Sequence, residues 1–243
     1  QPAEDTIQPS FPNILNQLIN IINVIAKNPS NPRFSHFTFE SVGCLVKYTS
    51  PQSLIPLIDS MMPCFLHILS EDIQEFIAYV FQIISYSIEK LGMVPETVKP
   101  LAQPLLVPSV WDLKGNVPAV TRMLKDLIRY DTTLFPDLIP VLGVFQRLIA
   151  SKAYEVHGFE LLESIMLYVS LDGLKPYLKQ IAVLLLQRLQ NSKTERYVKK
   201  LVVFLGLISW RLNGDFVVQF IDEVQEGIFH QYWRSFIVPT IPT

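Results

Sequence analysis

Four histidines are the residues best suited to acid-base chemistry or metal binding, and they lie at His36, His67, His157 and His230. Such chemistry needs further polar groups close to the imidazole. The four are far apart along the chain, and no C-x-x-C, H-E-x-x-H, G-x-S-x-G or glycine-rich phosphate loop accompanies them. The sequence therefore predicts no catalytic residue, no metal site and no cofactor. An all-α enzyme remains the rival of a different class, and a pocket of titratable groups with shifted pKa values would favour it.

The least ordinary polar feature is a reversal of charge near the end of the chain. Residues 192–211 hold five cationic side chains against Glu195 alone, a balance of +4, and residues 212–230 hold four carboxylates and no Lys or Arg, a balance of −4. We expect neighbouring helices either to pair through these charges or to present each a patch to a partner. An acidic partner would face Lys193, Arg196 and Lys200. A solvated surface is the plain alternative.

Proline marks the elements that must position these residues. Glycine occurs only 9 times and proline 18 times, and the prolines that open apolar helical patterns recur at a mean interval of 41 residues. They are Pro12, Pro56, Pro100, Pro136 and Pro176. A period in the low forties is typical of HEAT and armadillo arrays, in which each helix pair buries its apolar face against the next pair.

A second series of helices is expected to begin near Phe34, Asp72, Val117, Glu155 and Lys193. Residues 134–150 place their apolar side chains on one helical face, whereas 197–212 are apolar nearly all round and should be buried between adjacent repeats. Four prolines between 95 and 108 predict a broken helix over 94–107. The sequence thus predicts an all-α fold, a right-handed superhelical solenoid of antiparallel helix pairs. Residues 1–243 would form one HEAT-repeat array of about five to six repeats.

Composition excludes several classes of protein. Hydrophobic residues make up 49% of the chain and charged residues 17%, with a mean hydropathy of +0.30, so the chain must bury a core. A net charge of −2 lacks the basic excess that nucleic acid requires. The longest uncharged apolar run, 201–210, has about half the length of a membrane span. We therefore expect no nucleic acid and no membrane as partner, and the two cysteines fit a reducing compartment.

Six blocks of the sequence resemble one family of transport proteins, the CAS-type exportins of the karyopherin-β superfamily. They occur in the family's order and read NPSNPRFSHFTFES from residue 28, DIQEFIAYVFQI from 72, GNVPAV from 115, LGVFQRLIASKA from 142, HGFELLESI from 157 and LLLQRLQNSKTERYVKKLVVF from 184. The residues after 204 match only loosely. The chain is therefore similar to the C-terminal portion of a longer exportin.

The resemblance implies a function that composition does not show. Family members are HEAT superhelices that bind importin-α together with RanGTP, pass through nuclear pores and return importin-α to the cytoplasm. The implied partners are importin-α, nuclear pore proteins and RanGTP, with Ran held mainly by N-terminal repeats beyond this chain. The implied location is the nucleus and the cytoplasm, with shuttling between them. The alternative is another HEAT-repeat scaffold, of the importin or phosphatase regulatory subunit type.

The same resemblance points to polar residues near the starts of the second helices as contacts for partners, because these helices line the concave side of such solenoids. For Trp111 and Gly115 an anchoring aromatic and a turn residue are favoured over partner contact, and Asn116 lies beside them. The predicted partner-binding residues are Arg33, His36, Glu40, Lys152, His157, Arg188, Asn191, Lys193, Thr194, Arg196 and Lys200.

Overall fold

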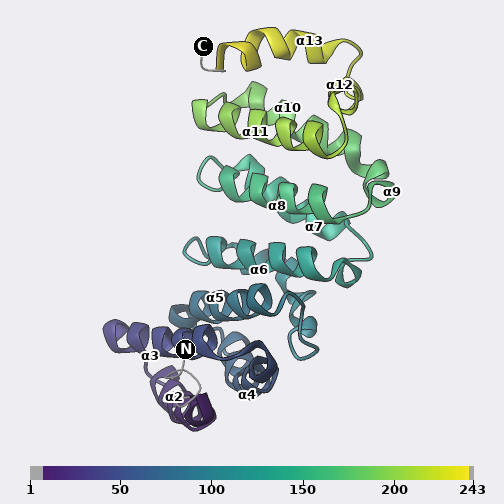
Figure 1. The fold of residues 1–243 in the computed structure, drawn as a ribbon. Helices are drawn as coiled ribbons and strands as arrows, with labels where there is room; N and C mark the ends of the chain where they lie inside the picture. Colours follow the sequence, from purple (N-terminus) through teal and green to yellow (C-terminus); the bar gives the residue numbers. More distant parts are fainter. Residues whose placement is uncertain (1–7, 241–243) are drawn as a thin grey trace. The chain divides into compact units, whose positions relative to one another are not determined.

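The computed structural model describes residues 8–240, and every regular element in that range is helical, with no strand. The prediction of an all-α fold is confirmed. The chain divides into two compact units, Gln1–Leu134 and Phe135–Thr243, each of which is described by itself (Figure 1). A single array over 1–243 stays a prediction.

The first unit is a stack of helical hairpins. It contains a 3-10 turn at Gln8–Ser10, then α2 (Phe11–Ala26), α3 (Pro32–Tyr48), α4 (Pro51–Ser70), α5 (Gln74–Leu91), α6 (Val117–Tyr130) and a last 3-10 turn at Thr132–Leu134. Proline stands in the first turn of α2, α3, α4 and α6, where its missing N–H costs no intrahelical hydrogen bond. Helix α2 packs on α3 and α4, α3 packs on α5, and α5 packs on α4 and α6 (Figure 1).

The second helices of this unit begin within two residues of the predicted positions 34, 72 and 117. Asn31 fixes the start of α3, because its side-chain oxygen accepts a hydrogen bond from the backbone N–H of Phe34 at 3.1 Å. Lys90 of α5 satisfies the other end of α3 by donating through Nζ to the carbonyl oxygens of Val46 at 2.8 Å and Thr49 at 2.6 Å. Burial lowers the pKa of Lys90. A side chain of α5 thus satisfies the carbonyl oxygens at the C-terminal end of α3.

Three 3-10 turns replace the first helix of the third hairpin. They lie at Lys99–Leu101, Pro104–Leu106 and Pro108–Trp111, so the predicted break over 94–107 is confirmed. Each proline removes a donor that an α-helix would need. Trp111 holds the turns together, since it is only 3% exposed and its Nε1 donates to the carbonyl oxygen of Leu105 at 2.8 Å. Gly115 lies in the turn before α6.

Helix α4 is the one described helix that is long and apolar enough to cross a membrane by length and composition, with a mean hydropathy of 1.4. The expectation that no segment reaches that length was wrong, because it counted only runs without any charged residue, and Asp59 interrupts this one. In the first unit α4 serves as a core helix. Met61, Met62 and Phe65 are buried, and α2 and α5 pack against the helix.

The second unit is also built of stacked hairpins (Figure 1). Its elements are α7 (Ile139–Ala150), α8 (Glu155–Tyr168), α9 (Leu171–Leu174), a 3-10 turn at Lys175–Tyr177, α10 (Leu178–Asn191), α11 (Glu195–Arg211), α12 (Gly214–Asp222), α13 (Ile228–Tyr232), a π-helical turn at Trp233–Ile237 and a 3-10 turn at Val238–Thr240. Helix α7 begins at Ile139, later than the 134–150 pattern suggests, and Asp137 in the preceding loop accepts from the N–H of Ile139 at 2.9 Å.

A column of aromatic side chains joins the layers of the second unit. Phe159 of α8 lies 5.1 Å from Tyr197 and 6.2 Å from Phe204 of α11, measured between ring centroids. Phe204 in turn lies 6.5 Å from Phe220 of α12. All four side chains are almost fully buried. Tilted aromatic pairs at these distances add to the stabilisation from buried apolar area, so the column fixes α11 between α8 and α12.

Helix α11 departs from the prediction that it is buried nearly all round. Its inner face is buried, but Val203 is 60% exposed and Trp210 is 81% exposed. Helices α8, α10 and α12 contact α11, and together they leave one of its sides open. The prediction that α11 is buried between adjacent repeats was therefore wrong for that side of the helix.

Candidate partner-binding surface

The predicted partner-binding residues fall into three places in the structure. Arg33, His36 and Glu40 lie on α3 of the first unit. In the second unit, Lys152 and His157 lie in the turn before α8 and in its first turn. The remaining six, Arg188, Asn191, Lys193, Thr194, Arg196 and Lys200, lie at the end of α10, in the following loop and on α11.

The three α3 residues are exposed, and Arg33 and His36 lie beside aromatic side chains. His36 places Nδ1 at 3.2 Å from the hydroxyl oxygen of Tyr79 on α5. The guanidinium of Arg33 lies 6.0 Å from the ring centroid of Phe37, at the outer limit of a cation–π contact. Arg33 and His36 thus contact aromatic rings, and the role of all three residues in partner binding stays a prediction.

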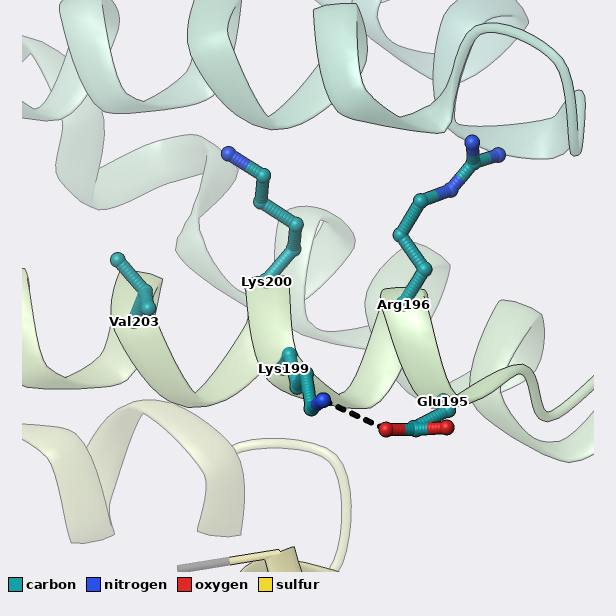
Figure 2. Close-up of a pocket in the computed structure, with 5 residues that line it drawn as sticks. All are labelled: Glu195, Arg196, Lys199, Lys200 and Val203. Atoms are coloured by element: carbon teal, nitrogen blue, oxygen red, sulfur yellow. Dashed lines mark ion pairs between the residues drawn. The ribbon is translucent and has the colours of Figure 1, made fainter.

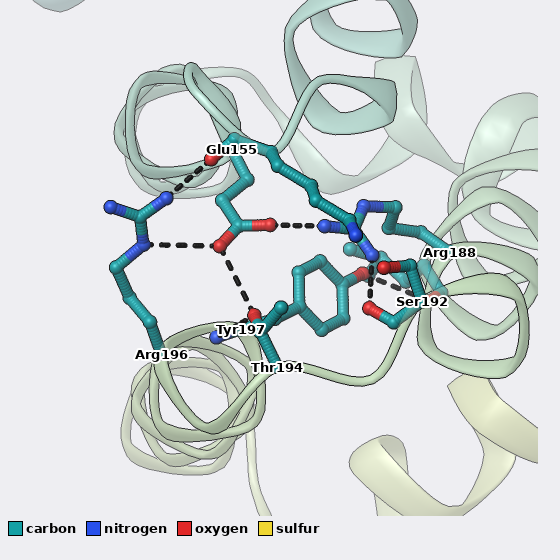
Figure 3. Close-up of polar contacts among 8 residues, drawn as sticks. Glu155, Arg188, Ser192, Thr194, Arg196 and Tyr197 are labelled. Atoms are coloured by element: carbon teal, nitrogen blue, oxygen red, sulfur yellow. Dashed lines mark hydrogen bonds and ion pairs between the residues drawn. The ribbon is translucent and has the colours of Figure 1, made fainter.

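Glu155 is the centre of a polar network in the second unit that sequence reasoning did not identify (Figure 3). It is the first residue of α8, and none of it is exposed to solvent. One carboxylate oxygen accepts from Arg188 of α10. The other accepts from Nε of Arg196 at 3.1 Å and from the hydroxyl of Thr194 at 3.3 Å. A buried carboxylate is tolerated because two guanidinium groups neutralise it.

Arg188 is committed to the interior of this network. It is 6% exposed, its second amino group donates to the carbonyl oxygen of Ser192, and its guanidinium lies 4.9 Å from the ring centroid of Tyr197. Tyr197 donates its hydroxyl hydrogen to the carbonyl oxygen of Leu185 at 2.8 Å, and burial raises the pKa of this phenol. The network therefore ties α8 to both α10 and α11. Arg188 contributes to a partner surface only through the arrangement of its neighbours.

The signal that could have found Glu155 is its place in the sequence. It is a carboxylate at the expected start of a helix whose other residues are mostly apolar. A carboxylate is favoured at a helix N-terminus by the helix dipole, but this preference does not show that the group is buried. Its partners stand 33 to 41 residues away along the chain. Spacing of that length carries no signal in a single sequence.

Exposed basic side chains gather on α11, next to this network. Arg196, Lys199, Lys200 and Val203, together with Glu195, line a cleft of about 460 Å³ (Figure 2). Figure 2 shows Arg196, Lys200 and Val203 extending to one side of the helix and Lys199 to the other, where its Nζ lies 2.5 Å from Oε1 of Glu195. Arg196 spans both features, since it contacts Glu155 and its side chain is still 56% exposed.

The other predicted residues of the second unit make fewer contacts. Lys152 supplies its backbone carbonyl oxygen to Arg196, and its side chain is exposed. His157 places Nδ1 at 3.4 Å from Oε2 of Glu160. Asn191 is exposed, and the amino group of Lys193 lies 4.4 Å from the ring centroid of Phe236. Eight of the eleven predicted residues thus lie in the second unit, partly inside it and partly on its surface, and the other three lie on α3 of the first unit.

The chemistry of this surface is binding by charge. The cleft offers three cations and one carboxylate, and its Val203 adds an apolar edge. Among residues 8–240 no group of three or more His, Cys, Asp or Glu side chains could hold a metal ion. The charge reversal predicted that neighbouring helices either pair through these charges or each present a patch. Two cations of the basic stretch pair with carboxylates outside the acidic stretch: Arg196 pairs with Glu155, and Lys199 pairs with Glu195. In the acidic stretch, Asp222 accepts from the N–H of Phe229 at 2.8 Å.

Comparison with known proteins gives one consistent family. The family profile described as "CAS/CSE protein, C-terminus" matches residues 2–243. The importin alpha re-exporter of Saccharomyces cerevisiae is 65% identical over all of this chain, that of Schizosaccharomyces pombe is 39% identical over 98% of it, and Exportin-2 of Homo sapiens is 35% identical over 98% of it.

A solved structure of the exportin Cse1 in its cargo-free, cytoplasmic state is also similar, with a TM-score of 0.94 and 65% identity over 99% of this chain. That protein is a HEAT-repeat solenoid, so the fold class here is all-α and of the HEAT-repeat type. The matched regions make up 25% to 26% of the relatives' own length. The chain therefore spans about a quarter of the proteins that it matches.

Proposed function

Because the chain belongs to the CAS/CSE family, we propose that it is the C-terminal segment of a nuclear export receptor that binds importin-α together with RanGTP and returns importin-α to the cytoplasm. The observation that carries the proposal is the 65% identity, over the whole chain, to a protein named importin alpha re-exporter. A solved structure with the same identity shares the fold of this chain. The role of the segment is to present part of the binding surface of a longer receptor.

The proposal includes the finer points that the family resemblance implies. RanGTP is bound mainly by repeats outside this chain, nuclear pore proteins are further partners, and the receptor shuttles between nucleus and cytoplasm. The chain itself catalyses no reaction, and any GTP hydrolysis belongs to Ran. The exposed cations of α11 support this role, because a partner with acidic groups would be attracted and oriented by them.

The alternative HEAT-repeat scaffolds, of the importin or phosphatase regulatory subunit type, have less support. The family profile covers residues 2–243, and the relatives described above are named re-exporters or exportins. A HEAT period alone would have left these alternatives equal.

The experiment that tests the proposed function is an affinity measurement with the full-length protein. Importin-α is titrated into it in the presence of Ran loaded with GTP, and separately with GDP, by isothermal calorimetry. We expect importin-α binding at least tenfold tighter with RanGTP. Equal affinity in the two nucleotide states, or no binding in either, would overturn the proposal. A phosphatase catalytic subunit serves as the control partner and should not bind.

A further inference from the structure

The open side of α11 carries a row of five exposed residues, and the first three of them also line the basic cleft. Arg196, Lys199, Val203, Gly206 and Trp210 are all exposed, and they follow one another at intervals of three, four, three and four residues. Their backbone positions share one side of α11, although the side chain of Lys199 turns away from Arg196 and Val203 toward Glu195. This alternation of intervals is the spacing with which one helix meets a second helix along a seam. We call these five residues the α11 seam.

The seam changes character along its length. Its first two residues are cationic, and its last three are valine, glycine and tryptophan. Trp210 is 81% exposed and Val203 is 60% exposed, although the opposite face of α11 is buried. Tryptophan and arginine are the residue types that most often dominate binding energy at protein interfaces. An exposed tryptophan in the middle of a packed unit therefore marks a contact surface.

Gly206 lies in the middle of the apolar half of the seam and has no side chain there. A Cβ atom built on it has no other heavy atom within 4 Å, so packing inside the unit does not require glycine at this position. Glycine instead allows another backbone to approach α11 closely. Beside it lies an apolar hollow of about 560 Å³, whose walls include Val217 of α12 and Trp233 of the π-helical turn. The hollow has room for a large apolar side chain from a partner.

We propose that the α11 seam is a docking site for one amphipathic helix of a partner protein. That helix carries Asp or Glu at the end that meets Arg196 and Lys199, and large apolar side chains at the end that covers Gly206 and Trp210. Arg196 and Lys199 pair with Glu155 and Glu195, but their side chains remain 56% and 62% exposed. The cleft around them holds three cations against one carboxylate. This excess of positive charge and the apolar hollow select the chemistry of the partner helix. From residue 196 to residue 210 the seam spans about 21 Å, so the partner helix has about four turns.

This inference rests on the proposed function, since it names the part of the receptor and the kind of partner segment that meet. The two can fail separately. The proposal for the α11 seam concerns an acidic, amphipathic helix, and synthetic peptides test it. The proposed function makes a statement about importin-α and RanGTP.

The test uses the full-length protein and three fluorescent peptides of about 21 residues. The first has a leucine seam at heptad spacing with glutamates at one end, the second has lysines in place of the glutamates, and the third repeats the first with two central prolines that prevent a helix. Binding is measured by fluorescence anisotropy. We expect the acidic helical peptide to bind at least tenfold more tightly than either of the others.

Variants of the receptor place the binding on the seam. Trp210→Ala and Lys199→Glu should each weaken the acidic peptide at least tenfold, while Ile139→Ala, which removes another side chain that is 63% exposed, should not. Arg196 is left unchanged because it also holds Glu155. Gly206→Leu fills the centre of the seam and should weaken binding as well. Circular dichroism establishes that each variant is folded.

Each result decides the proposal. Equal binding of the acidic and basic peptides would show that charge does not select the partner. Equal binding of the acidic peptide and the proline peptide would show that the partner need not be helical. Unchanged binding by Trp210→Ala would show that the peptide does not bind the α11 seam. Any of the three overturns the inference. If the peptides behave as expected and importin-α does not bind the receptor, the seam stands and the proposed function fails. If importin-α binds and the peptides do not bind at the seam, the proposed function stands and the inference about the seam fails.

Discussion

Removing the carboxylate of Glu155 leaves the guanidinium of Arg188 buried without its counter-charge. Breaking a buried ion pair from one side typically costs about 3–5 kcal/mol, because a desolvated charge remains. We expect Glu155→Ala to lower the free energy of unfolding by about that amount in urea denaturation of the chain. The matched control is Glu195→Ala, which removes an exposed carboxylate paired with Lys199. An unfolding midpoint unchanged in both variants would contradict the role given to Glu155.

A second residue with a measurable signature is Asp126 of α6, in the first unit. Burial raises its pKa from 3.8 to about 6, although the hydroxyl of Ser85 donates to it. The folded protein therefore keeps this proton over a pH range in which the unfolded chain has lost it. It follows that the free energy of unfolding contributed by this group decreases as pH rises from about 4 to about 6. Asp126→Asn should remove that slope from urea denaturation measured across the range. An identical slope in the variant would show that another group causes it.

Individual residues were predicted with mixed success, for a physical reason. The set from Arg188 to Arg196 was selected as long and polar, which fits a partner surface and an internal network equally well. Arg188 and Thr194 lie against Glu155, whereas Asn191 and Lys193 are exposed. Which polar residue is buried depends on helices that are distant in the sequence. Periodicity within one helix does not contain that information.

Helices α7 and α8 approach each other closely at Gly158. A Cβ atom there would lie 3.0 Å from the backbone nitrogen of Ile149, and backbone moves less easily than a side chain. We expect Gly158→Ala to lower the free energy of unfolding by about 1–3 kcal/mol through overpacking. Gly143 of α7 is the matched control, since a Cβ there meets no atom within 4 Å. Gly143→Ala should stabilise by about 0.5–1 kcal/mol, through helix propensity alone. Equal effects of both substitutions on the melting temperature would contradict the close approach.

At the scale of elements the sequence was most informative. Apolar periodicity located the second helices to within two residues, because each must bury one face. The prolines between 95 and 108 also predicted the break that became three 3-10 turns. The open side of α11 was missed, because an apolar helix that is covered by neighbours and one that awaits a partner have the same composition. Only the positions of α8, α10 and α12 distinguish them.

At the scale of the whole molecule, the chain is about a quarter of the receptors that it resembles. A receptor that holds its cargo at several places gains affinity from joining them, and a segment with one of these places loses that gain. We therefore expect the chain by itself to bind importin-α weakly, with little dependence on RanGTP. Calorimetry of the isolated chain measures this directly. Sub-micromolar, RanGTP-dependent affinity would contradict the view that the segment supplies only part of the surface.

The central claim is that this segment presents α11 to the cargo of a longer export receptor. Hydrogen–deuterium exchange of the full-length protein, with and without importin-α and RanGTP, tests it most directly. We expect assembly to slow amide exchange in Glu195–Arg211, the range of α11. If the complex forms and exchange in that helix is unchanged, while other parts of the receptor become protected, the claim is contradicted.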